Sequence, residues 1–244
     1  MALKTDCMKI IGLVFMLWLG SSCSDGDMVS SDTAAPKSTE KIVEAYKIEP
    51  GANLRSALLG DLDLRGSDLR GANLIGANLI NADLRGANLT GVNLTNANLT
   101  NADLRGANLR DANPTNSNMS DSNLYGVTLR DANLFGANLE RTFLRGANLT
   151  GANFYTVNLS EASLSEANLT AVNLYGANLT NADLTGSKLF LANLALANLT
   201  GANLTDANLE GAVLTGAILT GAVLKGSILT DAVLTDANLA DARR

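Results

Sequence analysis

Leucine recurs at every fifth position over most of this chain of 244 residues, and no insertion interrupts the spacing. Between Leu54 and Leu239 the spacing defines 38 sites, of which 35 are Leu; the exceptions are Pro114, Met119 and Phe154. The residue two places before each site is Ala in 27 repeats, and the residue directly before it is Asn in 23 and Asp in 5. Self-similarity at one fixed period indicates a repeat protein.

A period of five fits neither a regular helix nor a straight strand. On an α-helix, at about 100° per residue, successive Leu side chains would spread around the whole surface. On a straight strand, at about 180° per residue, they would alternate between two faces. All of them can point inward only if the chain turns a corner in every repeat. Strand alternation then places the small Ala on the same inward face as the Leu that follows it.

The repeat resembles the A-[DN]-L-x-x motif of the pentapeptide-repeat family, as in residues 147–151 (ANLTG) and 202–206 (ANLTD). The resemblance covers most of the chain, and we assign it to residues 51–244. It implies an all-β fold, a right-handed quadrilateral β-helix in which four repeats make one coil. The 38 repeats then correspond to about 9.5 coils.

A short amphipathic segment precedes the repeats. In residues 39–50 (TEKIVEAYKIEP), Ile42, Val43 and Tyr46 would share one face of a helix that Pro50 ends. Because a repeat array cannot leave its first hydrophobic layer open to water, we predict that this segment is a short N-terminal capping helix.

Residues 1–22 have the pattern of a signal peptide. Lys4 and Lys9 precede an apolar run at 10–19 that is too short to span a bilayer as a helix. The small residues that follow end at Cys23, which resembles the lipobox of bacterial lipoproteins, whose Cys is acylated and becomes the mature N-terminus. The resemblance implies attachment to a membrane by an N-terminal lipid on Cys23, with residues 23–38 as a flexible tether.

Three alternatives to the lipoprotein remain: secretion without a lipid, an uncleaved anchor, and a resemblance that has no function. Gly20 and Ser22 also suit ordinary signal peptidase. Cys7 leaves with the signal peptide, so Cys23 would have no disulfide partner within the exported chain, which favours acylation. We therefore expect a periplasm-facing lipoprotein, on the outer membrane according to the resemblance at Ser24, or else a secreted or periplasmic protein.

With four repeats in each coil, positions that are 20 apart stack in columns. We expect Asn to mark the corners and to form hydrogen-bonded ladders, one of which runs from Asn53 to Asn193. A column of arginines lies beside a column of aspartates, and we expect the two to neutralise each other and to bind no nucleic acid. The columns are Arg65, Arg85, Arg105 and Arg145, and Asp63, Asp83 and Asp103.

Exposed apolar side chains are the candidate contacts. An interaction patch for a protein or a glycan comprises Tyr125, Phe135, Tyr155, Tyr175 and Phe190. The alternative is that these rings only shield strand edges. A homodimer contact, which the family resemblance also implies, comprises Val213, Ile218, Val223, Ile228 and Val233, all at the position that is usually Asn or Asp. Its alternative is extra β-propensity in the final coils.

The composition argues against an enzyme. The chain has no His, and neither of its two Cys residues lies in the repeats, so we expect no cofactor, metal or catalytic site. We predict a non-catalytic, lipid-anchored or exported scaffold or protein-interaction rod of the bacterial cell envelope. The alternative is a DNA-mimicking protein that binds topoisomerases, as some members of the family do. The repeats carry 13 basic and 17 acidic residues, which is weakly acidic for such a mimic.

Overall fold

The computed structural model describes residues 41–43 and 46–244. The chain divides into two units, Met1–Lys37 and Ser38–Arg244, and the first of them lies outside the described residues. The signal peptide at 1–22, the lipid site at Cys23 and the tether at 23–38 therefore lie outside the described residues and stay predictions.

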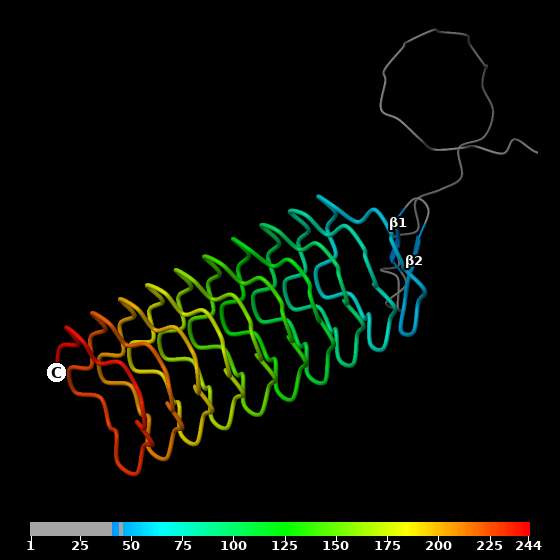
Figure 1. Cartoon of the computed structure of the whole chain (residues 1–244). Coiled ribbons are helices and arrows are strands. Elements are labelled where there is room, and N and C mark those ends of the chain that lie inside the picture. Colours follow the sequence, from blue (N-terminus) through cyan, green and yellow to red (C-terminus); the bar gives the residue numbers. More distant parts are fainter. Residues whose placement is uncertain (1–40, 44–45) are drawn as a thin grey trace, which may run out of the picture. The chain divides into compact units, whose positions relative to one another are not determined.

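The second unit is a solenoid whose coils stack along one axis (Figure 1). Parallel bridges join residues that are 20 apart, from Asn53↔Asn73 to Val223↔Arg243. Four such ladders run along the rod, so each coil has four sides and the quadrilateral β-helix class is confirmed. The right-handed sense and the number of coils stay predictions. Within the described residues, no helix interrupts the coils.

We name the four faces after their first bridged residues: the Asn53, Leu58, Asp63 and Asp68 faces. Each face comprises five residues per coil, beginning one residue before the bridged one, so residues 52–56 and those 20, 40 and more positions further on form the Asn53 face. Backbone hydrogen bonds tie one coil to the next. The Leu54 amide donates to the Asn73 carbonyl at 2.7 Å, and the Asn73 amide donates back to the Ala52 carbonyl at 2.9 Å.

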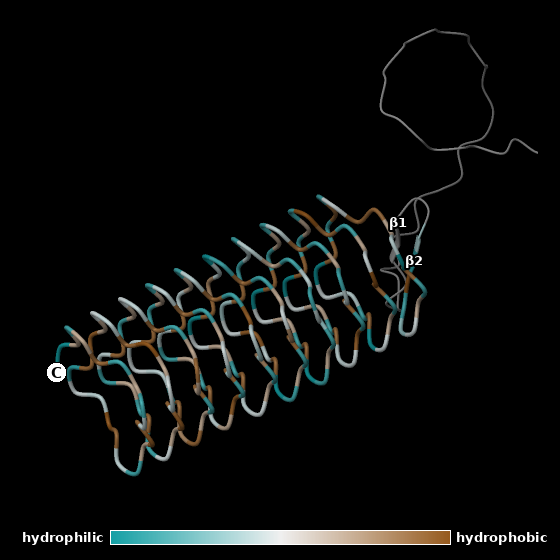
Figure 2. Ribbon diagram, in the orientation of Figure 1, coloured by the Kyte–Doolittle hydropathy of each residue, from teal (hydrophilic) through white to brown (hydrophobic). Residues whose placement is uncertain are grey.

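The inward positions are those that the repeat predicts. The central Leu of each repeat and the Ala two residues earlier are buried over nearly the whole array, and Met119 and Phe154 take the place of Leu in the same core. Hydrophobic and hydrophilic residues accordingly alternate along each coil (Figure 2). The core thins at the last coil, where Leu229, Leu234 and Leu239 are only partly buried.

The corners are not at the Asn positions, where we predicted them, but two residues after the central Leu. Every residue at this position, from Gly51 to Asp241, has positive φ between 53° and 71°. Nearly half of these residues are Gly, which adopts this conformation without strain. In a typical corner the Ala57 amide donates to the Leu54 carbonyl at 3.0 Å, so residue 56 is the third residue of a turn that requires positive φ, as in type II. The Asn before the Leu lies instead in the bridge.

The predicted capping helix at 39–50 is wrong. The segment contains two antiparallel strands, β1 (Lys41–Val43) and β2 (Tyr46–Ile48), with Val43 paired to Tyr46 and Lys41 to Ile48. Tyr46 and Ile48 alternate with exposed Lys47, a period of two that suits a half-buried strand. Ile48 is fully buried and belongs to the same core as the coils, and the amide of Leu58 donates to Tyr46 Oη at 3.2 Å.

Pro114 distorts the rod only locally. Proline has no amide hydrogen, and the bridge expected between Asn113 and Asn133 is the one missing from this region of the described ladders. The hydroxyl of Thr115 lies 3.5 Å from the carbonyl oxygen that is left over on Asn133. The ladders continue in the same register on both sides, at Asn108↔Thr128 and Asn118↔Asn138.

Candidate interaction surfaces

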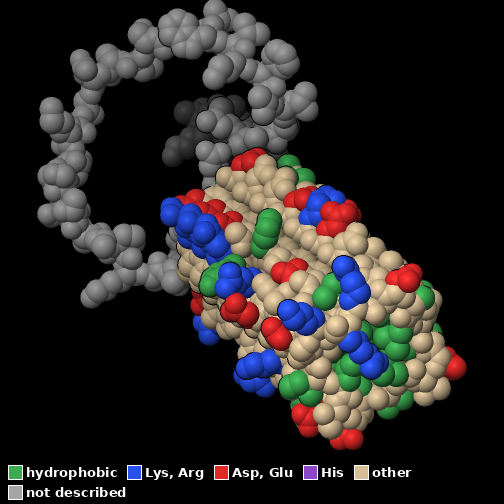
Figure 3. Space-filling model, turned by 90° about the vertical axis from the view of Figure 1, so that its left-hand side faces the viewer, with side chains coloured by type: hydrophobic (Ala, Val, Ile, Leu, Met, Phe, Trp, Pro, Cys, Tyr) green, Lys and Arg blue, Asp and Glu red, His purple; other side chains and the backbone are tan. Residues whose placement is uncertain are grey.

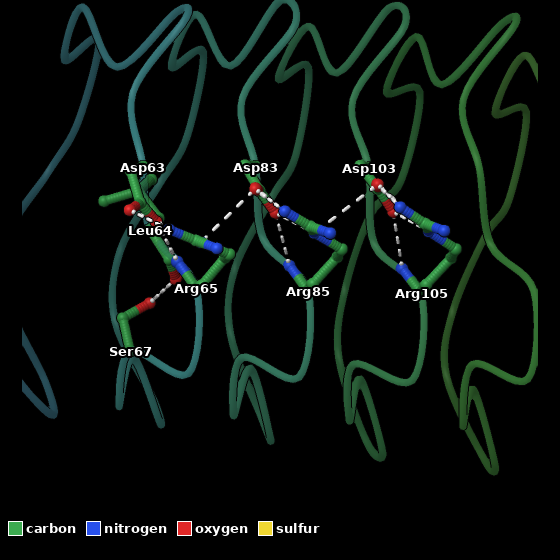
Figure 4. A network of polar contacts seen from close by, with 8 residues as sticks. All are labelled: Asp63, Leu64, Arg65, Ser67, Asp83, Arg85, Asp103 and Arg105. Atoms are coloured by element: carbon green, nitrogen blue, oxygen red, sulfur yellow. Dashed lines mark hydrogen bonds and ion pairs between the residues drawn. The ribbon is translucent and has the colours of Figure 1, made fainter.

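Acidic and basic side chains alternate along the Asp63 face (Figure 4). Asp83 accepts two hydrogen bonds from the guanidinium group of Arg85 in its own coil, the shorter at 2.5 Å, and its Oδ2 lies 3.5 Å from Nε of Arg65 in the preceding coil. Asp103 is bound in the same way by Arg105 at 2.6 Å and lies 3.7 Å from Arg85. Each carboxylate is therefore shared between two guanidinium groups, as the adjacent columns predict.

These pairs shift the pKa values of their members. The hydrogen bond from Arg85 lowers the pKa of Asp83, and its positive charge acts in the same direction. For Asp103, burial raises the pKa, but the hydrogen bonds and charge of Arg105 together outweigh it, so the pKa is lowered. Both members of each pair stay charged near neutral pH. From Asp63 to Arg105 the charges cancel locally, so this part of the face offers neither an unpaired basic stripe for nucleic acid nor an unpaired acidic one.

Asparagine amides form a continuous chain along part of the Asn53 face. From Asn133 toward the C-terminus, each Asn Nδ2 donates to the Oδ1 of the Asn one coil earlier. The distance is 3.3 Å for Asn133–Asn113 and 2.9 to 3.1 Å for the next three pairs. This confirms the predicted ladder from Asn113 to Asn193. Toward the N-terminus the pattern differs: Asn113 Nδ2 donates to Thr95 Oγ1 at 3.2 Å. The amides therefore hold coils together.

The structure brings three of the five predicted patch residues together. Phe135, Tyr155 and Tyr175 stack on the Asn53 face, with ring centroids 5.5 and 5.1 Å apart and interplanar angles of 10° and 7°. Because the rings cover one another's faces along the rod axis, their edges point outward. Tyr125 lies on the Asp63 face and Phe190 on the Asp68 face, so these two belong to other surfaces.

The five predicted dimer residues encircle the rod near its C-terminal coils. Val213 and Val233 lie on the Asn53 face, and the Leu58, Asp63 and Asp68 faces carry Ile218, Val223 and Ile228. Val223 is half-buried, and the other four are 36 to 46% exposed. In Figure 3 hydrophobic side chains gather in one area of the visible surface, apart from the rows of adjacent blue and red side chains.

Leu191 and Leu196 also belong to the exposed apolar surface. Both occupy corner positions, with φ of 55° and 58°, and both are 54% exposed. Neither residue belongs to the interaction patch predicted from the sequence, which comprised aromatic residues only. The signal that would have found them is a Leu in a column that elsewhere holds mostly Gly, Asn or Asp.

The described surface carries no sign of a metal or membrane-spanning element. Within residues 41–43 and 46–244, no three His, Cys, Asp or Glu side chains gather so that they could hold a metal ion. No helix in this part of the chain is long and apolar enough to cross a membrane.

Comparison with solved structures gives several β-helical relatives. The chain is 34% identical to HetL, a pentapeptide repeat protein involved in heterocyst differentiation regulation in the cyanobacterium Nostoc, over 76% of this chain and 91% of HetL, with a TM-score of 0.50. A pentapeptide repeat protein of the Arabidopsis thaliana thylakoid lumen is 38% identical over 42% of this chain and 72% of its own, with a TM-score of 0.41. QnrB1, a plasmid-mediated fluoroquinolone resistance protein, is 20% identical over 67% of this chain and 82% of its own, also at 0.41.

A search of curated proteins gave no match. The family of pentapeptide repeats matches in 8 copies, and the matched residues cover most of the solenoid: 51–86, 97–134, 129–162, 152–189, 192–231 and 217–243. No catalytic family is indicated. With its unbroken repeat, its four parallel ladders and this match, the chain belongs to the pentapeptide-repeat family.

Proposed function

We propose that this protein is a non-catalytic interaction rod of the bacterial cell envelope, held at a membrane by a lipid on Cys23. The observation that carries the interaction role is the division of the outer surface. The aspartates at 63, 83 and 103 are matched to arginines and amides are linked in ladders, whereas Tyr125 and Phe143 stay more than half exposed. A rigid solenoid holds such exposed side chains at fixed spacings, which suits binding of a partner.

The envelope location is supported by the leader of the chain. A basic start, an apolar run at 10–19 and small residues before Cys23 fit an export signal that ends at an acylation site. Cys7 offers a matched control, because it would be removed with the signal peptide. Replacing Cys23 with Ala should abolish metabolic labelling by fatty acid and release the rod from membranes, whereas Cys7→Ala should leave both unchanged. Membrane association that persists in Cys23→Ala would refute the lipid anchor.

The partner is proposed to be a protein or a glycan, with a second copy of the chain as a further candidate through the C-terminal coils. Affinity isolation of the processed rod from envelope extracts tests the interaction role directly. A rod in which Val213 and Val233 are replaced by Asn, the usual residue at their position, separates the homodimer from other partners. A dimer that depends on these residues should become a monomer in analytical ultracentrifugation. An unchanged sedimentation coefficient would exclude this contact.

The DNA-mimicking, topoisomerase-binding function is the weaker alternative. A mimic needs an array of unbalanced negative charge, but Asp83 and Asp103 are each bound by an arginine of their own coil. An export signal also removes the chain from cytosolic enzymes. Cell fractionation discriminates the two functions: unprocessed protein in the cytosol would favour the mimic and refute the envelope rod.

A further inference from the structure

The Asn53 face differs from the other faces in its charge. From Ala72 to Leu234, the five residues per coil that form this face include no Asp, Glu, Lys or Arg; the charged residues of the face are Arg55 and Asp236, near its two ends. The face therefore presents a long neutral strip on a rod whose other faces all carry charge. A charged group of a partner would lose its hydration at this strip without gaining a counterion. We therefore expect the part of a partner that contacts the strip to be uncharged.

The ring column on this face stops abruptly. Tyr175 stacks on Tyr155 on one side, but one coil further on the equivalent residue is Ala195. The two coils are in register, since Asn173 bridges Asn193 and the Gly176 amide donates to the Ala195 carbonyl at 2.9 Å. A single methyl group cannot cover an aromatic ring. Among the described residues, no further ring continues the stack, and we call this place the Ala195 step.

Strained apolar side chains stand at both corners of the same coil side. Leu196 follows Ala195 directly, and Leu191 is the corner at which the chain enters this side of the coil. Leucine is disfavoured at positive φ, because its Cβ crowds the following carbonyl. Both side chains lean over glycines of the next coil: their Cδ2 atoms lie 2.8 and 2.7 Å from the positions that a Cβ on Gly211 and Gly216 would occupy.

Exposed leucines in a strained conformation gain little for the fold. At 54% exposure, each side chain leaves about half of its surface in water, and glycine or asparagine would fit the same corner better. Apolar surface that the fold leaves exposed at these corners points to a role in binding. These two residues flank the coil side on which the ring column ends.

We propose that the Ala195 step binds an aromatic side chain of a protein partner. The partner's ring would stack on the open face of Tyr175 at the spacing of the existing rings, and its neighbouring atoms would contact Leu196 and Leu191. This inference rests on the proposed interaction role and names its contact. Aromatic pairs prefer centroid separations of about 4.5 to 7 Å, and the spacing of about 4.8 Å between coils places a ring at this step within that range.

The observations favour an aromatic side chain over a sugar. A sugar ring brings several hydroxyl groups that need hydrogen-bond partners, and the neighbouring Asn amides are engaged in the ladder along the rod. Asn193 donates to Asn173, and Asn173 donates to Asn153, at 3.1 and 3.0 Å. The leucines at the two corners have no polar side-chain atoms. A polypeptide segment with an aromatic residue between uncharged neighbours matches this surface.

A small-molecule titration tests the contact on the rod itself. The methyl groups of Ala195 and Leu196 are observed by NMR while N-acetyl-phenylalaninamide, N-acetyl-leucinamide or methyl β-glucoside is added. Only the aromatic probe should shift both methyl signals upfield in a saturable manner. In Tyr175→Leu, which removes the ring that the probe would stack on, the upfield shifts at Ala195 and Leu196 should vanish, whereas Tyr175→Phe should retain them. Equal shifts with the glucoside, or shifts that persist in Tyr175→Leu, would overturn the proposal.

Capture from envelope extracts tests the same contact with natural partners. Tyr175→Leu should reduce recovery of the captured protein by about tenfold, the effect of one lost aromatic pair, relative to Tyr175→Phe. A partner that both variants capture equally binds elsewhere, which refutes this inference but leaves the interaction role intact. If neither variant nor the unmodified rod captures any protein, the interaction role itself fails. If the captured protein is a second copy of the chain, the separate partner is excluded.

Discussion

Nε of Arg65 lies 3.5 Å from the carboxylate of Asp83 one coil further on, while Nη2 of the same arginine binds Asp63 of its own coil at 2.7 Å. One guanidinium group therefore joins two coils electrostatically, in addition to the backbone ladder. The arrangement repeats at Arg85, which lies 3.7 Å from Asp103. Because positions that are 20 apart stack, a local Asp-x-Arg sequence becomes a chain of alternating charges along the rod.

The first prediction is a loss of stability in acid. The pKa values of Asp83 and Asp103 are lowered below the ordinary value of 3.8. Carboxyl groups with a lowered pKa in the folded state contribute stability above their unfolded pKa, and this contribution is lost as the pH falls through the folded value. We expect the double variant Asp83→Asn, Asp103→Asn to unfold at a lower temperature than the unmodified rod at neutral pH. At a pH below the lowered pKa values, the unfolding temperatures of the variant and of the unmodified rod should become equal. A difference between them as large as at neutral pH would contradict this prediction.

The second prediction concerns the central leucines. Leu149 is fully buried between two stacked coils, which cannot close a cavity without breaking their ladders. Leu149→Ala should therefore lower the free energy of unfolding by about 2–5 kcal/mol. Leu229, at the equivalent position in the last coil, is only partly buried, and Leu229→Ala should cost clearly less. Denaturant titration of both variants measures the difference, and equal losses would show that the coils do not hold the core as described.

The third prediction concerns the strained corner at Leu196. Its φ of 58° suits Asn, which occupies other corners such as Asn181 at 56°. Leu196→Asn should raise the free energy of unfolding by about 1 kcal/mol, because it relieves the left-handed conformation of a leucine. Ala195→Asn, at the neighbouring residue, which does not have positive φ, is the control and should bring no such gain. A loss of stability in Leu196→Asn would mean that the leucine packs usefully against Gly216.

The repeat allowed most of the interior to be predicted. Leu at every fifth position and Ala two residues earlier require a chain that turns in each repeat, and both positions are buried as expected. The corner itself was misplaced, because a polar Asn before the Leu suits both a turn and a hydrogen-bonded ladder. Its side chain in fact accepts from the amide two residues on, as Asn93 does from Thr95 at 3.1 Å. Only the backbone angles distinguish the two positions.

The segment before the repeats and the outer surface were harder to predict. Tyr46 and Ile48 are compatible with either a helix or a strand, and their burial against the first coil decides between them. Columns of residues 20 apart follow directly from the period, so the stack of Phe135, Tyr155 and Tyr175 could be expected. Aromatic residues that are close in sequence, such as Tyr125, are placed on another face by the corners between them.

The fourth prediction concerns buried hydroxyl groups at the inward Ala position. Ser122 Oγ donates to the Met119 carbonyl at 2.5 Å, but Ser187 Oγ is buried without a hydrogen-bond partner. Ser187→Ala should therefore stabilise the rod by about 1 kcal/mol, because it removes an unsatisfied polar group. Ser122→Ala should instead be neutral or slightly destabilising. Thermal unfolding compares the two, and a loss of stability in Ser187→Ala would show that its hydroxyl is satisfied in solution.

The fifth prediction is that Pro114→Leu repairs the ladder. Pro114 stands at the central position, which is Leu in nearly all of the remaining repeats. Because proline has no amide hydrogen, the Asn133 carbonyl accepts only a long hydrogen bond of 3.5 Å from the Thr115 hydroxyl. A leucine would supply the missing amide donor, as Leu134 does for Asn153 at 2.8 Å, and a side chain of the size that fills the core elsewhere. The net gain from one backbone hydrogen bond is about 1 kcal/mol, and better packing adds to it. Hydrogen exchange should show a protected amide at residue 114 together with a higher unfolding temperature. If that amide exchanges freely, the strands at this point are held apart by more than the proline ring.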